Sequence, residues 1–322
     1  MKELEFLKII KETLNNSSYI GDDCAFLDDL DIFVTHDTLI EDEHFSLYTT
    51  TPFLLGRKAI AVNLSDLAAA MAIPKFVTVS ISLPEDKDED FVRELYRGIN
   101  EICSEFNVKV IGGDITGSEK TVISVCAIGK KNSLFISSRS NAKQGDIVVA
   151  TGHFGSSACG YYSLKSFLML DEKILLAHTD PIPRVNEGIE LSRIIDKDIT
   201  TIDSSDGLAD SLWKLAKESR HSIMLDYDSV PVEDEVKKFA QYNEVNLSDL
   251  VLWGGEDYEL IACVDKDTFE MLDKNKFKPI GKVLNKDLTP CVLVKSKDFE
   301  LKINDKTYSE NAYDHFGSRL AK

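Results

Sequence analysis

Residues 53–74 have the sequence FLLGRKAIAVNLSDLAAAMAIP, a long and almost continuously apolar stretch. Its apolar residues fall on every side at helical spacing, which predicts a buried helix rather than a surface helix. Asp66 lies inside this run, and an unpaired buried carboxylate costs too much free energy to be left alone. Asn63 precedes it by about one turn, so both polar side chains point toward one place. We expect Asp66 either to be satisfied by an arginine or a nearby cap, or to bind a cation.

The composition is that of an ordinary globular protein with an acidic surplus. A length of 322 residues predicts about two domains, each long enough to bury a core. The chain has 55 Asp and Glu against 37 Lys and Arg. No basic patch is evident, which argues against nucleic acid or an anionic membrane as a partner. The surplus is compatible with divalent-cation sites, although a solvated acidic surface is its commoner cause.

The cysteines occur singly, never as Cys-x-x-Cys, and most have apolar neighbours: Cys24, Cys103, Cys126, Cys159, Cys263 and Cys291. This pattern predicts buried thiols in a reducing compartment. The N-terminus predicts a charged amphipathic helix rather than a signal sequence, and no run is long enough to span a membrane. We expect a cytoplasmic protein.

The first half mixes helices and strands. Apolar spacing predicts helices at 3–14, 53–74 and 88–106, and strands at 32–35, 76–83, 108–111 and 121–128. These elements indicate an α/β protein with α+β layers. Acids follow several elements: Asp23 in a loop, Asp37 at the exit of the strand 32–35, and Asp114 after a Gly-Gly pair that allows close backbone approach to a ligand. Taken alone, Asp23 is more often a solvated loop residue, and Asp37 is either a cap or a site residue.

The amino-acid composition changes near residue 140. Residues 137–146 are polar and turn-rich, so we expect one domain at 1–140 and a second at 141–322. In the second half, the strand 147–150 runs into a Gly-rich turn at 151–158, which is a weak signal for anion binding at a helix N-terminus. The strand 199–203 leads to Asp203 and Asp206, which would serve equally well as helix caps.

Several common motifs are missing from the sequence. It contains no Gly-x-x-x-x-Gly-Lys-Ser/Thr and no Gly-x-Gly-x-x-Gly, so neither a P-loop nor a dinucleotide fold is supported. It offers instead acids at element ends together with Asp66. Oxygen ligands with few convergent His or Cys residues suit Mg²⁺, which binds through a few carboxylates plus substrate phosphates. Phosphoryl transfer then needs mainly positioning and charge neutralisation from the protein.

Eight short motifs occur in one order between residues 21 and 316: Gly-Asp-Asp-Cys-Ala, Thr-His-Asp-Thr followed by His44-Phe45, Asn-Leu-Ser-Asp-Leu-Ala-Ala, Gly-Gly-Asp, Ser-Arg-Ser-x-Ala-Lys-x-Gly-Asp, Ser-Asp-Gly-Leu, Gly-Gly-Glu-Asp-Tyr-Glu-Leu and Tyr-Asp-His-Phe. Each motif is weak alone. Together they resemble the thiamine-monophosphate kinase family, which belongs to the superfamily of aminoimidazole ribonucleotide synthetase and selenophosphate synthetase.

The resemblance implies transfer of the γ-phosphoryl group of ATP, in line and without a protein nucleophile, onto thiamine monophosphate. The product would be thiamine diphosphate, so the reaction would be the last step of its biosynthesis. The family fold has an N-terminal domain with a mixed sheet and helices, which dimerises through its sheet, and a larger C-terminal α/β domain. The implied partners are ATP, thiamine monophosphate and a second copy of the chain, and the implied cofactor is Mg²⁺, several ions per site.

The resemblance also implies roles for individual residues. The Mg²⁺ ligands would be Asp23, Thr35, His36, Asp37, Asp66, Asp114, Asp203 and Asp206. The ATP contacts would be Tyr96, Gly113, Asp114, Arg139 and Ser205. The thiamine substrate would contact His44, Glu256 and Tyr313, with Tyr313 offering its ring face to a cationic aromatic ring. His36 stands where Ser or Thr is common in the family, so a metal there would meet its backbone carbonyl.

Two rival functions remain open from the sequence. One is another activity of the same superfamily, in which ATP cleavage drives a cyclisation or the formation of selenophosphate. The other is a non-catalytic metal-binding or regulatory protein on the same fold. Loss of the acids would have favoured the second rival, but every one of them is present.

Overall fold

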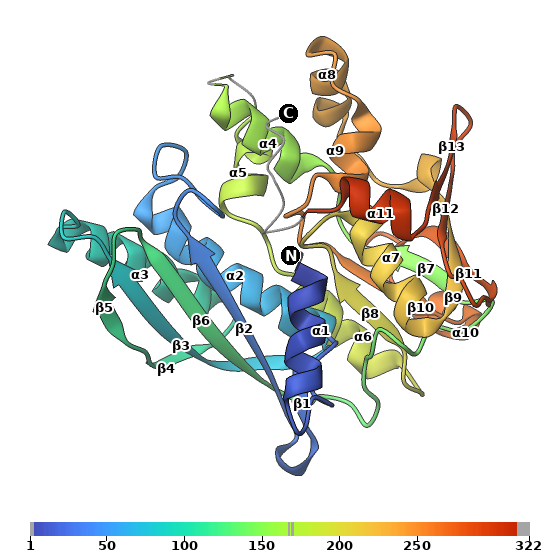
Figure 1. Ribbon diagram of the computed structural model, residues 1–322, viewed down its shortest axis with the longest axis horizontal. Coiled ribbons are helices and arrows are strands. Elements are labelled where there is room, and N and C mark those ends of the chain that lie inside the picture. Colours follow the sequence, from blue (N-terminus) through green and yellow to red (C-terminus); the bar gives the residue numbers. More distant parts are fainter. Residues whose placement is uncertain (1–2, 167, 169–170, 314–322) are drawn as a thin grey trace.

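The computed structural model describes residues 3–166, 168 and 171–313, and every structural statement below concerns these residues. The chain forms two sheets, each with helices packed against it (Figure 1). This is the α/β arrangement that the sequence predicts.

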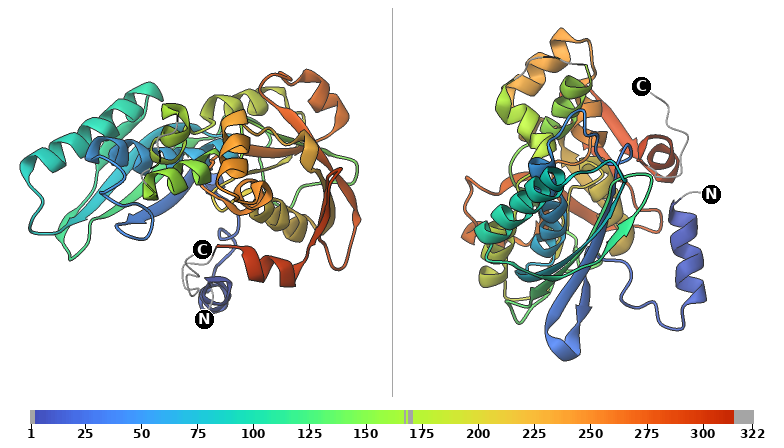
Figure 2. Two further views of the ribbon diagram at one scale, coloured as in Figure 1. Left: turned by 90° about the horizontal axis from the view of Figure 1, so that it is seen from above. Right: turned by 90° about the vertical axis from the view of Figure 1, so that its left-hand side faces the viewer.

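The first sheet has six strands from the N-terminal half, in the order β1-β2-β6-β3-β4 with β5 also beside β3. Their bounds are β1 (Ala25–Leu27), β2 (Ile32–Ile40), β3 (Ile73–Leu83), β4 (Lys109–Gly112), β5 (Ile115–Gly117) and β6 (Val122–Lys130). The pairs β1/β2, β2/β6 and β6/β3 are antiparallel, whereas β4 and β5 run parallel to β3. Helices α2 (Pro52–Ala69) and α3 (Glu89–Glu105) cover one face of this sheet (Figure 2).

Two predicted boundaries in this half are wrong. The strand predicted at 32–35 continues to Ile40, so Asp37 lies inside β2, opposite Val125, and not at a strand exit. The alternation of inward and outward side chains in β2 continues through its polar residues His36, Asp37 and Thr38. The helix predicted to reach residue 74 ends at Ala69, because Met71 has a left-handed φ of 56° that no helix interior accepts.

The second sheet has seven strands in the order β13-β12-β9-β11-β7-β10-β8. Their bounds are β7 (Ile147–Ala150), β8 (Thr200–Asp203), β9 (His221–Asp226), β10 (Leu260–Val264), β11 (Lys278–Lys286), β12 (Val292–Lys295) and β13 (Glu300–Ile303). The pairs are antiparallel except β12 with β9. The other helices are α1 (Glu3–Thr13), α4 (Ser156–Lys165), α5 (Glu172–Thr179), α6 (Val185–Ile194), α7 (Leu208–Ser219), α8 (Asp234–Tyr242), α9 (Leu247–Trp253), α10 (Lys266–Met271) and α11 (Asp305–Asn311).

Helix α2 lies between the two sheets, as its apolar sequence predicts. It packs against α3, β2 and β6 on one side and against α6 and β8 on the other. Glycines make these approaches possible: a Cβ on Gly98 of α3 would lie 1.9 Å from the Phe53 carbonyl oxygen, and one on Gly188 of α6 would lie 2.4 Å from that of Ala68. Backbones in such close contact fix the position of α2, and with it the position of Asp66.

The connection between the two sheets runs from β6, which ends at Lys130, to β7, which begins at Ile147. The division predicted at residues 140 and 141 falls inside this connection and stays a prediction. The thiols are free, and five of the six are buried. None of the described helices is long and apolar enough to cross a bilayer.

Candidate active site

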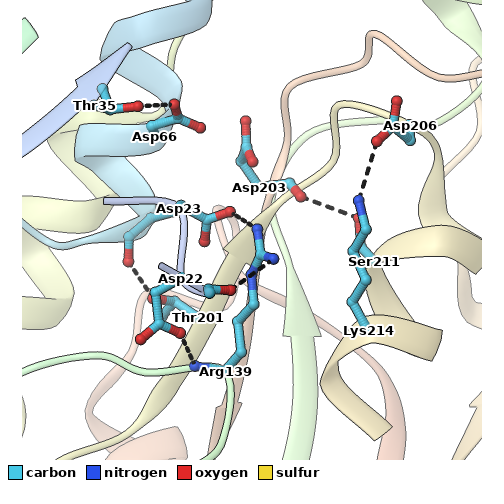
Figure 3. Close-up of polar contacts among 12 residues, drawn as sticks. Asp22, Asp23, Thr35, Asp66, Arg139, Thr201, Asp203, Asp206, Ser211 and Lys214 are labelled. Atoms are coloured by element: carbon cyan, nitrogen blue, oxygen red, sulfur yellow. Dashed lines mark hydrogen bonds and ion pairs between the residues drawn. The ribbon is translucent and has the colours of Figure 1, made fainter. Parts of the chain in front are cut away.

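Three carboxylates from distant parts of the chain meet beside α2. Asp23 comes from the loop before β1, Asp66 from α2 and Asp203 from the last position of β8, and one oxygen of each lies within 4.8 Å of the others. We call these three residues the acid cluster. Figure 3 shows their side chains facing one another. The sequence places them up to 180 residues apart, but the burial of α2 between the two sheets brings them together.

Hydroxyl groups and one guanidinium hold the acid cluster in place. Thr35 of β2 donates a hydrogen bond to Asp66, and Ser65 donates one of 2.6 Å to Asp203. Arg139 forms an ion pair with Asp23, and its Nη1 donates to the Gly21 carbonyl oxygen at 3.1 Å. The cluster therefore has a defined geometry but one cation for three carboxylates.

Burial and the repulsion of neighbouring carboxylates favour the protonated forms of Asp66 and Asp203. Burial, followed by the charge of Asp37, raises the pKa of Asp66 well above its usual range. Burial, followed by the charge of Asp23, raises the pKa of Asp203 to about 7. Since desolvation and like charges both favour the protonated forms of Asp66 and Asp203, a bound cation is what would favour their ionised forms.

Asp37 and His36 point to opposite faces of β2. The Asp37 carboxylate lies near Asp66 on the face covered by α2, and the Asp37 backbone N–H donates to Asn63 at 3.2 Å. The His36 ring lies 2.8 Å from the Ser124 hydroxyl on the other face. The side chain of His36 therefore faces away from the acid cluster, which leaves its backbone carbonyl as the group that a metal would meet.

Glu256 lies in a second polar group, next to α2. It pairs with Lys58 of α2 at 2.9 Å and with His178 of α5 at 3.2 Å. Burial favours the protonated acid, but the charge and hydrogen bond of Lys58, together with smaller contributions from neighbouring side chains, outweigh it and the pKa of Glu256 is lowered. Burial lowers the pKa of His178 to about 4, so this imidazole is neutral at pH 7. Glu256 is thus an ionised carboxylate fixed by a buried lysine.

The three acids of the Gly-Gly-Glu-Asp-Tyr-Glu segment have different partners. Asp257 accepts from the backbone N–H groups of Gly155 at 2.8 Å and Ser157 at 3.1 Å, at the start of α4. The helix N-terminus that the Gly-rich turn suggested as an anion site is therefore occupied by a carboxylate of the chain itself. Glu259 accepts two 2.5 Å hydrogen bonds from Arg184, which makes it a structural ion pair.

Asp206 lies apart from the acid cluster. Its carboxylate pairs at 3.1 Å with Lys214 of α7 (Figure 3). Lys214 also pairs at 2.7 Å with the buried Asp210. Ser205, next to it, accepts a 2.6 Å hydrogen bond on its backbone oxygen from the Glu256 N–H. This bond places the Gly-Gly-Glu segment against the end of β8.

Two of the predicted binding residues, Gly113 and Asp114, lie far from the acid cluster within the chain. Gly113 and Asp114 are exposed and follow β4, three strands away from β2, which is roughly 14 Å at the usual strand spacing. Gly113 lacks a side chain because its backbone lies close to β3: a Cβ there would lie 1.8 Å from the Val79 carbonyl oxygen. Tyr96 lines a shallow groove on α3. Their roles in binding remain predictions.

His44 and Tyr313 are the other two residues predicted to contact the substrate. The His44 ring accepts a 3.1 Å hydrogen bond from the Ile40 N–H and lies close enough to Glu256 to help lower its pKa. Tyr313 is the last described residue and is about half exposed. The rest of the predicted Tyr-Asp-His-Phe motif, residues 314–316, lies outside the described residues.

A cavity of about 460 Å³ opens beside Asp23. The residues that line it include Phe26, Phe33, Ser137 and Ser138. This volume is typical of small-molecule sites. It provides space for a ligand next to the acid cluster.

Comparison with known proteins identifies the family. The family described as "AIR synthase related protein, N-terminal domain" matches residues 21–130. A thiamine-monophosphate kinase from Bacillus subtilis is 35% identical over 286 residues, covering 84% of this chain and 86% of that protein. One from Pyrococcus horikoshii is 32% identical over 285 residues, covering 88% of each. The chain belongs to the thiamine-monophosphate kinase family.

Solved structures agree with the sequence relatives. A thiamine monophosphate kinase from Aquifex aeolicus superimposes with a TM-score of 0.82 at 29% identity, covering 92% of this chain and 96% of that one. A structure described as AaThiL complexed with AMPPCP and TMP gives the same TM-score, covering 94% and 96%. The hydrogenase maturation protein HypE in complex with ATP, at 17% identity and a TM-score of 0.72, shares the fold. The predicted family and fold are confirmed.

Sequence reasoning missed several residues that shape this kinase-family site. Lys58 could have been suspected, because a lysine inside an otherwise apolar buried helix needs a buried partner. Ser65 stands next to Asp66 and was not assigned a role. His178 and Lys214 carry no local signal, since each becomes significant only through a contact with a distant residue.

Proposed function

We propose that this protein transfers the γ-phosphoryl group of ATP directly onto the phosphate of thiamine monophosphate, giving thiamine diphosphate and ADP. The convergence of Asp23, Asp66 and Asp203 carries the proposal, because charge neutralisation is the main requirement of phosphoryl transfer. The relatives named as thiamine-monophosphate kinases, and the related structure with AMPPCP and TMP, support ATP and thiamine monophosphate as the substrates.

The acid cluster fits Mg²⁺. Its donors are all oxygen atoms, they come from a loop, helix α2 and strand β8, and burial together with neighbouring carboxylates raises the pKa values of Asp66 and Asp203. We infer that Asp23, Asp66 and Asp203 hold Mg²⁺, with Asp37 and Thr35 beside them. Bound there, Mg²⁺ would neutralise the polyphosphate and help to orient the γ-phosphoryl group.

Arg139 is placed to neutralise phosphate charge at the same site. Its guanidinium already pairs with Asp23, and its side chain is largely buried, so little motion is needed to reach a phosphate that arrives at the acid cluster. Burial, followed by the charge of Asp66, raises the pKa of the adjacent Cys24 thiol well above its usual range. A protonated thiol is a poor nucleophile, which favours direct transfer to the substrate over a covalent intermediate.

Glu256 is placed to recognise the thiamine part of the substrate. Lys58 and His178 fix its carboxylate, and Ser205 fixes its backbone, so its orientation is set before a ligand arrives. His44 lies nearby, and the Tyr313 ring is exposed at the end of the described chain. An ionised carboxylate and an aromatic face suit a cationic heteroaromatic ring.

The remaining expectations belong to the same proposal. Tyr96, Gly113, Asp114 and Ser205 would contact ATP, and Asp114, Asp206 and the His36 carbonyl would bind further Mg²⁺. The open face and outer edge of the N-terminal sheet would form a homodimer interface, in agreement with the exposed side chains of Phe76, Val110, Ile111 and Ile115. The protein would act in the cytoplasm as two domains, 1–140 and 141–322.

A stoichiometry measurement tests this function. The protein is incubated with Mg²⁺, ATP and thiamine monophosphate, while thiamine diphosphate, ADP and free phosphate are followed together. We expect thiamine diphosphate and ADP to rise one for one without free phosphate. ADP and phosphate rising together without thiamine diphosphate would show that the acceptor is wrong.

A further inference from the structure

Asp206 is a predicted metal ligand whose carboxylate pairs with a lysine. Among the described residues, Asp23, Asp66 and Asp203 form a group of three acids close enough to share one ion, and Asp206 is not part of it. An ammonium lies 3.1 Å from its carboxylate instead, supplied by Lys214 two turns further along the chain. The side chain of Asp206 therefore already has a cation of the protein beside it.

Lys214 is fixed in this position by a second ion pair. Its ammonium lies 2.7 Å from Asp210, whose side chain is 3% exposed. The Tyr308 hydroxyl donates a 2.7 Å hydrogen bond to Asp210, and the Tyr308 ring stacks on Trp213 at a centroid distance of 3.6 Å. Because withdrawal of Lys214 would leave Asp210 buried without its counter-ion, the ammonium is held at Asp206 and does not swing freely.

A divalent ion at Asp206 would have to displace this ammonium or bind beside it. Two cations within about 4 Å repel strongly even when solvent screens them in part. From this arrangement we infer that Lys214 is a built-in cation at Asp206, so that the nucleotide-free protein binds divalent ions at the acid cluster and not at Asp206. This inference rests on the metal site of the proposed function, and it adds that an ion at Asp206 requires the nucleotide.

Binding of Mn²⁺ to the nucleotide-free, full-length protein tests the inference without any assay of activity. Free Mn²⁺ is counted by electron paramagnetic resonance for the wild type, Asp203→Asn and Asp206→Asn. We expect Asp203→Asn to weaken binding by about tenfold or more, because it removes a ligand of the acid cluster. Asp206→Asn should leave the number of ions and their affinity within about twofold of the wild type.

The lysine itself gives the second comparison. Lys214→Met should bind Mn²⁺ about tenfold more tightly at an additional or weak site, and this gain should vanish in Lys214→Met combined with Asp206→Asn. Lys214→Arg keeps the charge and should behave as the wild type. Lys217→Met is the matched control, since Lys217 lies one turn further along α7 and pairs with Asp305 instead.

The outcomes separate the inference from the function on which it rests. If Asp206→Asn weakens Mn²⁺ binding as much as Asp203→Asn does, or if a folded Lys214→Met binds Mn²⁺ as the wild type does, the inference is wrong. If Asp203→Asn leaves binding unchanged, the metal site of the proposed function fails. The comparison of the two aspartate variants holds even if Lys214→Met does not fold.

Discussion

Asp203 illustrates how a metal site opposes folding. Its carboxyl is buried beside Asp23, and its pKa is raised to about 7. Below pH 7 it is protonated in the folded protein, whereas in the unfolded chain it ionises near pH 4. The native state therefore binds the additional proton between pH 4 and 7, and this residue makes the metal-free protein less stable as the pH rises through that window.

Replacement of Asp203 by Asn should remove this effect. In EDTA at pH 8 the variant should be more stable than the wild type by up to about 4 kcal/mol, and at pH 5 the difference should fall to about 1.5 kcal/mol. Urea unfolding at the two pH values measures it. If the two proteins differed in unfolding free energy by the same amount at pH 5 and at pH 8, the pKa of Asp203 would not be raised in the folded protein.

Lys58 should matter for the substrate and for stability together. Lys58→Met leaves Glu256 buried without its main counter-ion, which should destabilise the fold by about 3 kcal/mol. It should also raise the KM for thiamine monophosphate by about tenfold or more while the KM for ATP changes little.

The pH profile of the Lys58→Met variant gives the sign of the effect. The charge of Lys58 lowers the pKa of Glu256 against burial, so in the variant this pKa should rise. The acidic limb of kcat/KM for thiamine monophosphate should then move to higher pH. Stability should recover in Lys58→Met combined with Glu256→Gln, and an unshifted acidic limb would argue against an ionised Glu256 in substrate binding.

Helix α2 positions the site because glycines let its neighbours approach. Gly98→Ala would drive a Cβ to 1.9 Å from the Phe53 carbonyl oxygen, so the two helices must move apart. We expect a loss of about 2 kcal/mol or more in the free energy of unfolding. Gly117→Ala is the control, because its Cβ would meet nothing within 4 Å. If both variants lost a similar free energy of unfolding, the close contact between α2 and α3 would not be the reason for a glycine at residue 98.

Helices and strands could be predicted from the sequence where apolar residues recur at the spacing of a helix or a strand. The burial of α2, and the presence of Asp66 in it, followed from apolar residues on every side of the helix. The extent of β2 did not, because His36 and Asp37 look like the end of a strand until the covering helix shows which face is polar. The contact of Asp257 with the N-terminus of α4 could not be predicted either. Asp257 lies about 100 residues away in the sequence, and only the packing of the second sheet brings it there.

At the scale of the whole molecule, the ordered motifs predicted the family and its acids but not how they meet. Asp23, Asp66 and Asp203 were all named from the sequence, and the structure brings them together. The pairing of Glu256 with Lys58 and of Asp206 with Lys214 depends on long-range packing that no single stretch encodes.

The proposed homodimer is a property of the whole molecule. Sedimentation velocity at micromolar concentration should show a dimer. Ile115→Lys, at a side chain that is 71% exposed on the edge strand β5, should shift the protein toward monomer without unfolding it. Leu288→Lys, at a fully exposed position in the second half, should leave the dimer intact. A wild-type protein that sediments only as a monomer would contradict the interface.

The central claim is that the acid cluster supports direct phosphoryl transfer, and a single-turnover experiment with ATP labelled at the γ-phosphate tests it most directly. In the wild type, the label should pass to thiamine diphosphate without appearing in free phosphate. In a folded Asp66→Asn variant, the same transfer should slow by about a hundredfold or more. Label released as free phosphate by the wild type, or equal transfer rates in the two proteins, would contradict the account.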